Sequence, residues 1–154
     1  MSKIILLYGL IFFSVNVKAE ESKRVPFYDC FSGAARHFSV NKLVLIAIAN
    51  TESKFDPGVI SKVNNNGSFD LGIMQINSSW FPQLLKSGIT NRDLLNGCTN
   101  IYVGAWILSH NIKSYGNTWK AVGAYNARTP LKQVIYVNKV ISAAVDIKQN
   151  YYLN

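Results

Sequence analysis

A helical pattern of apolar residues begins near residue 28. Asp29 is expected to cap a helix over residues 31–38, because its short acidic side chain can accept hydrogen bonds from the free N–H groups of a first turn. Residues 41–51 are apolar at nearly every position, and a helix that is apolar on all sides is a buried one. This buried helix should end near Ser53, because Pro57 disfavours helical geometry in the residue before it.

Polar turn residues interrupt the helical pattern between residues 59 and 77. Residues 64–68 read Asn-Asn-Asn-Gly-Ser, a strong turn signal between two short stretches that could pair as a small β-hairpin. We expect a mainly α fold in which this hairpin is the only sheet.

Helical periodicity returns after the hairpin and continues almost to the C-terminus. Further helices are expected over residues 99–115, 118–126 and 131–148, the second being short. The first of them has a predicted buried stripe of Ile101, Ala105, Leu108, Ile112 and Tyr115. The last has a predicted buried stripe of Val134, Val137, Ile141 and Ala144.

The N-terminal residues have the pattern of a secretory signal peptide. An apolar run over residues 4–15 follows Met-Ser-Lys, and residues 17–19 supply a signal peptidase site. An uncleaved anchor is disfavoured, because the run is broken by Ser14 and is shorter than the roughly 20 residues of a membrane span. We predict cleavage after Ala19 and an exported, periplasmic protein without stable membrane insertion. No linker or repeat divides residues 20–154, so a single domain is expected.

The net charge indicates which kind of binding partner is favoured. The net charge is +8, and loss of Lys3 and Lys18 with the leader makes it +6. The basic residues are scattered, which favours a carboxylate- and phosphate-rich bacterial wall over nucleic acid as the partner.

Cys30 and Cys98 are the two cysteines, and a lone pair in an exported protein typically forms a disulfide, although a reactive thiol is the alternative. The two histidines lack metal-ligand spacing, so neither a metal nor another cofactor is expected.

Six of the eight acidic residues have positions typical of the surface or of a helix cap, whereas Glu52 and Asp70 do not. Glu52 comes at the end of the predicted buried helix, where burial and the negative end of the helix dipole both raise the pKa of a carboxyl group. A protonated carboxyl group is what cleavage of a glycosidic bond requires. Asp70 follows the predicted turn, where it could face Glu52 across a cleft. The plainer interpretations are an exposed residue at a frayed helix end for Glu52 and a turn-stabilising residue for Asp70.

Three ordered motifs carry a resemblance to a known family. They are Glu52-Ser53, residues 66–77 (Asn-Gly-Ser-Phe-Asp-Leu-Gly-Ile-Met-Gln-Ile-Asn) and residues 124–127 (Ala-Tyr-Asn-Ala). Together they resemble soluble-type lytic transglycosylases, and the match covers roughly residues 30–127. The chain is similar in size and cysteine placement to small exported members that accompany type III and type IV secretion systems, pili and conjugation machinery.

The resemblance implies a lysozyme-like fold and cleavage of peptidoglycan between N-acetylmuramic acid and N-acetylglucosamine. It implies that Glu52 is the acid and base of a reaction that forms a 1,6-anhydro ring. It also assigns Gln75, Tyr125 and Asn126 to the substrate cleft, and Ser53 to the end of the catalytic helix or to substrate binding.

Two departures from the family pattern leave the product open. Residues 67–80 also resemble animal c-type lysozymes, with Asp70 at their second catalytic carboxylate. Asp70 could therefore stabilise the transition state or act as the nucleophile of a hydrolase. Arg128 stands where the family usually has Gly after its Tyr-Asn-Ala motif. A catalytically idle wall-binding protein of a secretion complex is the alternative from a different class.

Overall fold

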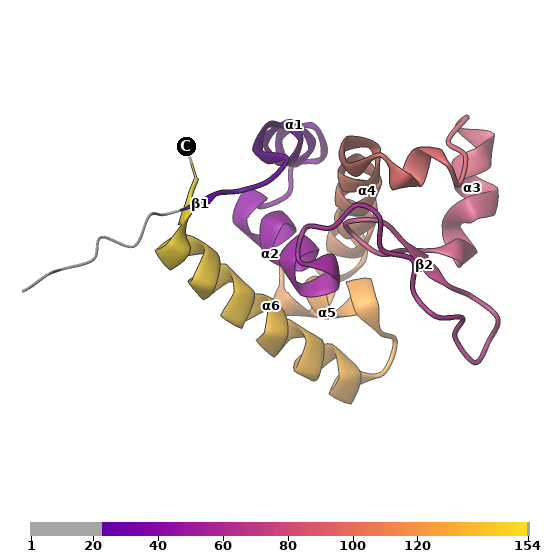
Figure 1. The fold of residues 1–154 in the computed structure, drawn as a ribbon. Coiled ribbons are helices and arrows are strands. Elements are labelled where there is room, and N and C mark those ends of the chain that lie inside the picture. The colour runs from indigo at the N-terminus through magenta and orange to yellow at the C-terminus, as the bar shows by residue number, and fades with distance from the viewer. Residues whose placement is uncertain (1–22, 154) are drawn as a thin grey trace, which may run out of the picture.

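The computed structural model describes residues 23–153. The chain is mainly helical, as predicted: α1 (Tyr28–Phe38), α2 (Lys42–Ser53), α3 (Phe81–Lys86), α4 (Gly97–Tyr115), α5 (Trp119–Asn126) and α6 (Pro130–Asn150). Single 3-10 turns lie at Ser78–Trp80 and Asp93–Leu95. Figure 1 shows α6 lying across α2 and α5, and α4 between α1 and α3. The predicted signal peptide, residues 1–19, lies outside the described residues.

The predicted buried helix is α2. It begins where Oδ1 of Asn41 accepts a hydrogen bond from the backbone N–H of Val44 at 3.1 Å, which satisfies a free donor of the first turn. Residues 45–49 are completely buried. The helix ends at Ser53, because Lys54 takes a left-handed conformation with φ 56°. The predicted burial and the predicted end are both confirmed.

The predicted cap of α1 is wrong. Phe27 is the N-cap, with φ 56°, and Asp29 already lies within the first helical turn. The backbone carbonyl of Phe27 accepts hydrogen bonds from the N–H groups of Cys30 and Phe31. Asp29 instead lies 3.6 Å from the guanidinium group of Arg24, and both side chains are exposed.

The turn over residues 64–68 forms, but the regular strands lie after it. Residues 59–63 pair with the returning chain through a single bridge between Ile60 and Leu71. The antiparallel ladder is instead β2 (Asp70–Leu71) with β3 (Ile76–Asn77). A second sheet, which was not predicted, pairs β1 (Lys23–Arg24) in parallel with β4 (Tyr151–Tyr152). Two-residue strands from opposite ends of the described chain are too short to leave a periodic signal.

The two predicted helix stripes have different outcomes. In α4, Ile101, Ala105 and Leu108 are buried, whereas Tyr115 is exposed at the helix end. In α6 half of the predicted stripe is wrong, because Val134 and Ile141 are exposed, whereas Val137 and Ala144 are partly buried against the core. Its buried face is Tyr136, Val140, Ala143 and Ile147. The helix is therefore rotated from the prediction, and a tyrosine points inward.

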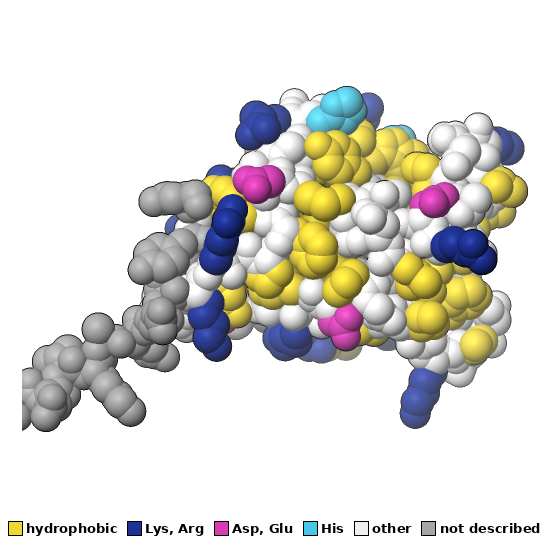
Figure 2. Space-filling model, turned by 45° about the horizontal axis from the view of Figure 1, so that its top comes forward, with side chains coloured by type: hydrophobic (Ala, Val, Ile, Leu, Met, Phe, Trp, Pro, Cys, Tyr) yellow, Lys and Arg dark blue, Asp and Glu magenta, His cyan; other side chains and the backbone are white. Residues whose placement is uncertain are grey.

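A disulfide between Cys30 and Cys98 confirms the predicted pairing, with the two Cα atoms 5.3 Å apart. It joins α1 to the first turn of α4. No helix among residues 23–153 is long and apolar enough to span a bilayer. On the face shown in Figure 2, Lys and Arg side chains stand apart from one another and apolar side chains gather over the middle.

Candidate active site

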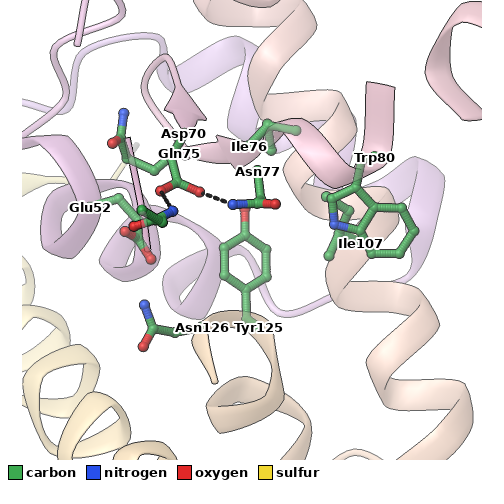
Figure 3. Close-up of a pocket in the computed structure, with 10 residues that line it drawn as sticks. Glu52, Asp70, Gln75, Ile76, Asn77, Trp80, Ile107, Tyr125 and Asn126 are labelled. Atoms are coloured by element: carbon green, nitrogen blue, oxygen red, sulfur yellow. Dashed lines mark hydrogen bonds between the residues drawn. The ribbon is translucent and has the colours of Figure 1, made fainter. Parts of the chain in front are cut away.

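A cavity of about 280 Å³ brings together five of the six predicted catalytic and substrate-binding residues. They come from three separate parts of the chain: the end of α2, the hairpin and the end of α5. The five residues are Glu52, Asp70, Gln75, Tyr125 and Asn126 (Figure 3). The remaining wall consists of Asn64, Ile76, Asn77, Trp80 and Ile107.

Glu52 lies in the last turn of α2, partly buried, with its carboxyl group at the cavity. Burial is the main cause that raises its pKa to about 7, and the negative charge of Asp70 raises it further. A hydrogen bond from Tyr136 and the positive charge of Lys139 act in the opposite direction. The predicted rise in the Glu52 pKa is thus present, and its chief cause is loss of hydration.

The partner of Glu52 is a residue that the sequence did not indicate. The hydroxyl of Tyr136, which is buried on α6, donates a hydrogen bond of 2.6 Å to Oε1 of Glu52. This bond orients the carboxyl group. The available signal was a tyrosine inside an apolar helix, since a buried hydroxyl needs a hydrogen-bond partner.

Asp70 is held at the cavity by polar neighbours. Its Oδ1 accepts a 2.8 Å hydrogen bond from the side-chain amide of Asn77 (Figure 3). Its Oδ2 accepts hydrogen bonds from Ser61 at 3.2 Å and from Asn64 at 3.4 Å. The cavity therefore contains one carboxyl group in a desolvated setting and a second in a polar, hydrogen-bonded setting.

Gln75 has a backbone conformation that few residues adopt, with φ 47°. Its side-chain NH₂ group donates to the backbone carbonyls of Gly72 at 2.9 Å and Val59 at 3.1 Å. Because both bonds use the nitrogen, the amide oxygen is the end that can accept a hydrogen bond from a ligand. A left-handed non-glycine residue costs on the order of 1 kcal/mol and is typical of functional sites.

Tyr125 and Asn126 close the cavity from α5. The Tyr125 hydroxyl donates to the backbone carbonyl of Met74 at 2.9 Å, which ties α5 to the hairpin. Burial raises the pKa of Tyr125 well above its usual value, so the phenol stays neutral. Asn126, the last residue of α5, is exposed and can contact a ligand.

Ser53 differs from the other predicted residues, because it does not line this cavity. Its hydroxyl donates to the backbone carbonyl of Ile73 at 2.8 Å. The residue thus connects the end of α2 to the hairpin. This contact orders the end of α2, and a role of Ser53 in substrate binding stays a prediction.

Asn100 on α4 fixes the base of the hairpin from below. It is completely buried. Its side-chain oxygen accepts from the N–H of Met74 at 2.8 Å, and its nitrogen donates to the carbonyls of Leu71 and Leu94. Gly72, with φ 77°, packs directly on the Asn100 amide where a side chain would collide. The second motif is therefore held on a rigid support.

One aromatic residue, Trp80, belongs to the cavity wall. Trp80 lines the cavity and packs edge-on against Trp106, with ring centroids 5.2 Å apart. Sugar rings have apolar faces that stack on such indoles. Tyr102 and Trp119 are exposed. In the described part of the chain, no three His, Cys, Asp or Glu side chains are grouped to hold a metal ion.

A helical fold with one desolvated and one hydrogen-bonded carboxyl group in a single cavity is typical of proteins that cleave glycosidic bonds. Residues 29–133 match the family described as the transglycosylase SLT domain. The chain belongs to this family, as its motifs predicted.

Relatives of known sequence agree with this membership. The chain is 47% identical over 106 residues to "Invasion protein IagB" of Salmonella typhimurium, covering 68% of this chain and 66% of that protein. It is 39% identical over 106 residues to "Protein IpgF" of Shigella flexneri, covering 68% and 69%. It is 34% identical over 129 residues to "X polypeptide" of Escherichia coli, covering 79% and 76%. The match to IagB thus spans just under two thirds of that relative.

A solved structure shares the fold. Lytic transglycosylase Slt of Pseudomonas aeruginosa superposes with a TM-score of 0.64 at 21% identity, over 81% of this chain and 24% of that one. The likeness confirms the predicted lysozyme-like, mainly α architecture.

Proposed function

We propose that this protein is a peptidoglycan lytic transglycosylase that cleaves the β-1,4 bond between N-acetylmuramic acid and N-acetylglucosamine. The observation that carries the proposal is the Glu52 carboxyl group, whose pKa is about 7, in a cavity lined by the motif residues. Near neutral pH such a group donates a proton readily, and its conjugate base accepts one readily. Membership of the SLT family supports the same activity.

Glu52 carries both proton transfers of the proposed reaction. It donates its proton to the glycosidic oxygen as the bond from that oxygen to the muramyl C1 breaks. Its carboxylate then takes the proton of the muramyl C6 hydroxyl, whose oxygen bonds to C1 and closes the 1,6-anhydro ring. No water is consumed. Because Tyr136 binds Oε1, the other carboxyl oxygen is available for both transfers.

The remaining cavity residues bind the sugar or stabilise the charge that develops as the bond breaks. The fixed carboxylate of Asp70 stabilises positive charge that develops at C1. The side chains of Gln75 and Asn126 present polar groups to the sugar, and Trp80 presents an apolar ring. Tyr125 shapes the wall and keeps the hairpin in place.

A hydrolytic reaction is the second candidate, and the hydrogen-bonded position of Asp70 favours it. In that reaction Asp70 acts as nucleophile or stabiliser, and water completes the cleavage to leave a reducing end. The two reactions share the Glu52 acid step and differ in what attacks C1.

Analysis of the products separates the candidates. Purified sacculi are digested, and the soluble muropeptides are identified by mass spectrometry. The transglycosylase predicts 1,6-anhydro ends, whereas reducing ends would establish a hydrolase. Glu52→Gln keeps the shape of the side chain and removes the proton donor, so it should abolish release of either product. Unchanged lysis by Glu52→Gln would favour the catalytically idle wall-binding protein.

We also propose that the protein acts in the periplasm, where it opens the wall locally for a cell-envelope secretion machine. The similarity to a protein named for invasion supports this role, as does the resemblance to small exported transglycosylases of secretion, pilus and conjugation systems. Deleting the gene should lower assembly of the machine, and wild type but not Glu52→Gln should restore it. Restoration by Glu52→Gln would instead support a structural role.

A further inference from the structure

A second groove lies on the two helices that hold Glu52 and Tyr136. It has a volume of about 530 Å³ and runs between α2 and α6. It shares no lining residue with the Glu52 cavity. Thr51 lines the groove and Glu52 lines the cavity, so adjacent residues of α2 serve the two sites.

The side chains of two lysines and one aspartate line the groove. Lys54 and Lys139 line it, together with Asp146. A side-chain oxygen of Asp146 accepts a 2.7 Å hydrogen bond from the amide of Asn150. Within residues 23–153 the ion pair formed is Arg24 with Asp29, so neither lysine has a carboxylate partner there. Two lysines and one aspartate give the groove an excess of one positive charge, which favours an anionic ligand.

Asn50 supplies a second, independent sign of a ligand. It is only 7% exposed and lines the groove. Its side-chain amide makes no hydrogen bond to another group of the described chain, and its polar atoms are not sealed from solvent, so they are open to the groove that Asn50 lines. A ligand with hydrogen-bonding groups would satisfy it.

The backbone after α2 holds Lys54 at the edge of this groove. Lys54 and Phe55 are both left-handed, with φ 56° and 67°, a costly conformation for two consecutive non-glycine residues. The turn buries Phe55, whose ring packs edge-on against Phe31 and Tyr151. Since the Phe55 ring is buried in the core, the backbone of the neighbouring Lys54 has a defined position.

The groove is electrostatically coupled to the cavity. The positive charge of Lys139 lowers the pKa of Glu52, and Lys139 follows Tyr136, the hydrogen-bond partner of Glu52, by about one turn of α6. Where a stem peptide is attached, the muramyl lactyl group is an amide and the glycan is uncharged, so the carboxylates lie on the peptide. A strand without stem peptides keeps one lactyl carboxylate on each muramyl residue. A ligand group that is anionic, peptide-like and attached beside the scissile bond is therefore part of the substrate.

We propose that the groove between α2 and α6 binds carboxylates of the stem peptide, with Lys54 and Lys139 as the charged contacts and Asn50 as a hydrogen-bonding contact to the peptide. The inference rests on the proposed function, because it assigns a part of the same substrate. It makes the groove a site that distinguishes peptide-bearing strands from bare glycan.

The test compares two substrates with one enzyme. Sacculi freed of secondary polymers are used intact, or after an amidase has removed the stem peptides. For wild type, kcat/KM should be higher on peptide-bearing strands. In Lys54→Gln/Lys139→Gln the ratio of kcat/KM on intact to peptide-free strands should fall about tenfold, as expected for two partly exposed charged contacts. The ratio cancels any effect of Lys139 on Glu52.

The matched control is Lys132→Gln/Lys148→Gln. It makes the same change in net charge with two exposed lysines of α6 that lie outside the groove, and it should leave the ratio unchanged. An equal fall in the control would mean non-specific attraction to the wall and would overturn the inference. An unchanged ratio in Lys54→Gln/Lys139→Gln, at an unaltered melting temperature, would overturn it as well.

Binding in a Glu52→Gln background separates this inference from the proposed reaction. Cosedimentation with intact sacculi should weaken about tenfold when Lys54 and Lys139 are replaced. Binding of the soluble peptide-free strands, measured by calorimetry, should weaken much less. If wild type cleaves neither substrate but this difference is observed, the proposed activity fails and the groove assignment stands. Equal weakening of binding to both substrates would remove the groove assignment alone.

Discussion

The hydroxyl of Tyr136 lies 2.6 Å from Oε1 of Glu52 and donates a hydrogen bond to it. The two residues are far apart in sequence and meet because α6 packs across α2. Burial of Glu52 favours the neutral acid, whereas the bond from Tyr136 favours the carboxylate. The pKa of Glu52 is thus set mainly by loss of hydration and by this opposing hydrogen bond, with further contributions from the charges of Asp70 and Lys139.

Tyr136→Phe removes the hydrogen bond that lowers the pKa of Glu52. The pKa of Glu52 should rise above its value of about 7. A hydrogen bond to a carboxylate contributes about 1.5 kcal/mol, which corresponds to about one pH unit. The alkaline limb of the profile of kcat/KM against pH should therefore move up by about one unit, while the maximal rate falls because the carboxyl group is less well oriented.

Tyr115→Phe is the matched control, since Tyr115 loses the same hydroxyl at the exposed end of α4. Its profile should coincide with that of wild type. An alkaline limb that stays in place or moves down in Tyr136→Phe would refute the role assigned to the hydrogen bond.

The raised pKa of Glu52 also has a consequence for stability. The ordinary value of 4.5 applies to the unfolded chain and about 7 to the folded one, so the folded state holds its proton more tightly. Stability is therefore lost as pH rises from 4.5 to 7, by up to about 3 kcal/mol, and is unaffected by Glu52 below this window. Glu52→Gln should be more stable than wild type at pH 8 by up to that amount.

Urea unfolding at pH 4 and pH 8 measures this difference. The gap between Glu52→Gln and wild type should be largest at pH 8 and nearly absent at pH 4. Asp146→Asn, a change at an exposed carboxylate of α6, should show a gap below about 0.5 kcal/mol at both values. A Glu52→Gln protein that is less stable than wild type at pH 8 would contradict the desolvated state of the carboxyl group.

Sequence reasoning succeeded where one physical signal decided the outcome. The apolar stretch of α2 could only be a buried helix, and the motifs then located Glu52, Asp70, Gln75 and Tyr125 around one cavity. Sequence reasoning failed on α6, where two faces of the helix have the same apolar periodicity. On α6 the spacings of three and four allow two apolar faces, and the choice depends on Tyr136 reaching Glu52, a tertiary contact that a linear pattern does not contain.

The rotation of α6 is testable with two isoleucines of the same helix. Ile147 is completely buried, whereas Ile141 is 37% exposed and belonged to the stripe that the sequence predicted to be buried. Ile147→Ala should lower the free energy of unfolding by about 3 kcal/mol. Ile141→Ala should cost less than about 1 kcal/mol, because little cavity is created and alanine favours the helix. The reverse order in urea unfolding would restore the predicted stripe.

The disulfide between Cys30 and Cys98 should be a large contribution to stability. It closes a loop with a sequence separation of 68 residues, and restricting the unfolded chain over such a loop is worth about 4 kcal/mol in the chain-entropy account. Reduction of the purified protein should lower the free energy of unfolding by about that amount. A Cys30→Ala/Cys98→Ala variant should be less stable from the start and insensitive to reductant, which separates the bond from other effects of the reagent. Alkylation without reduction should label neither cysteine, and labelled thiols in the purified protein would show that the bond is not formed.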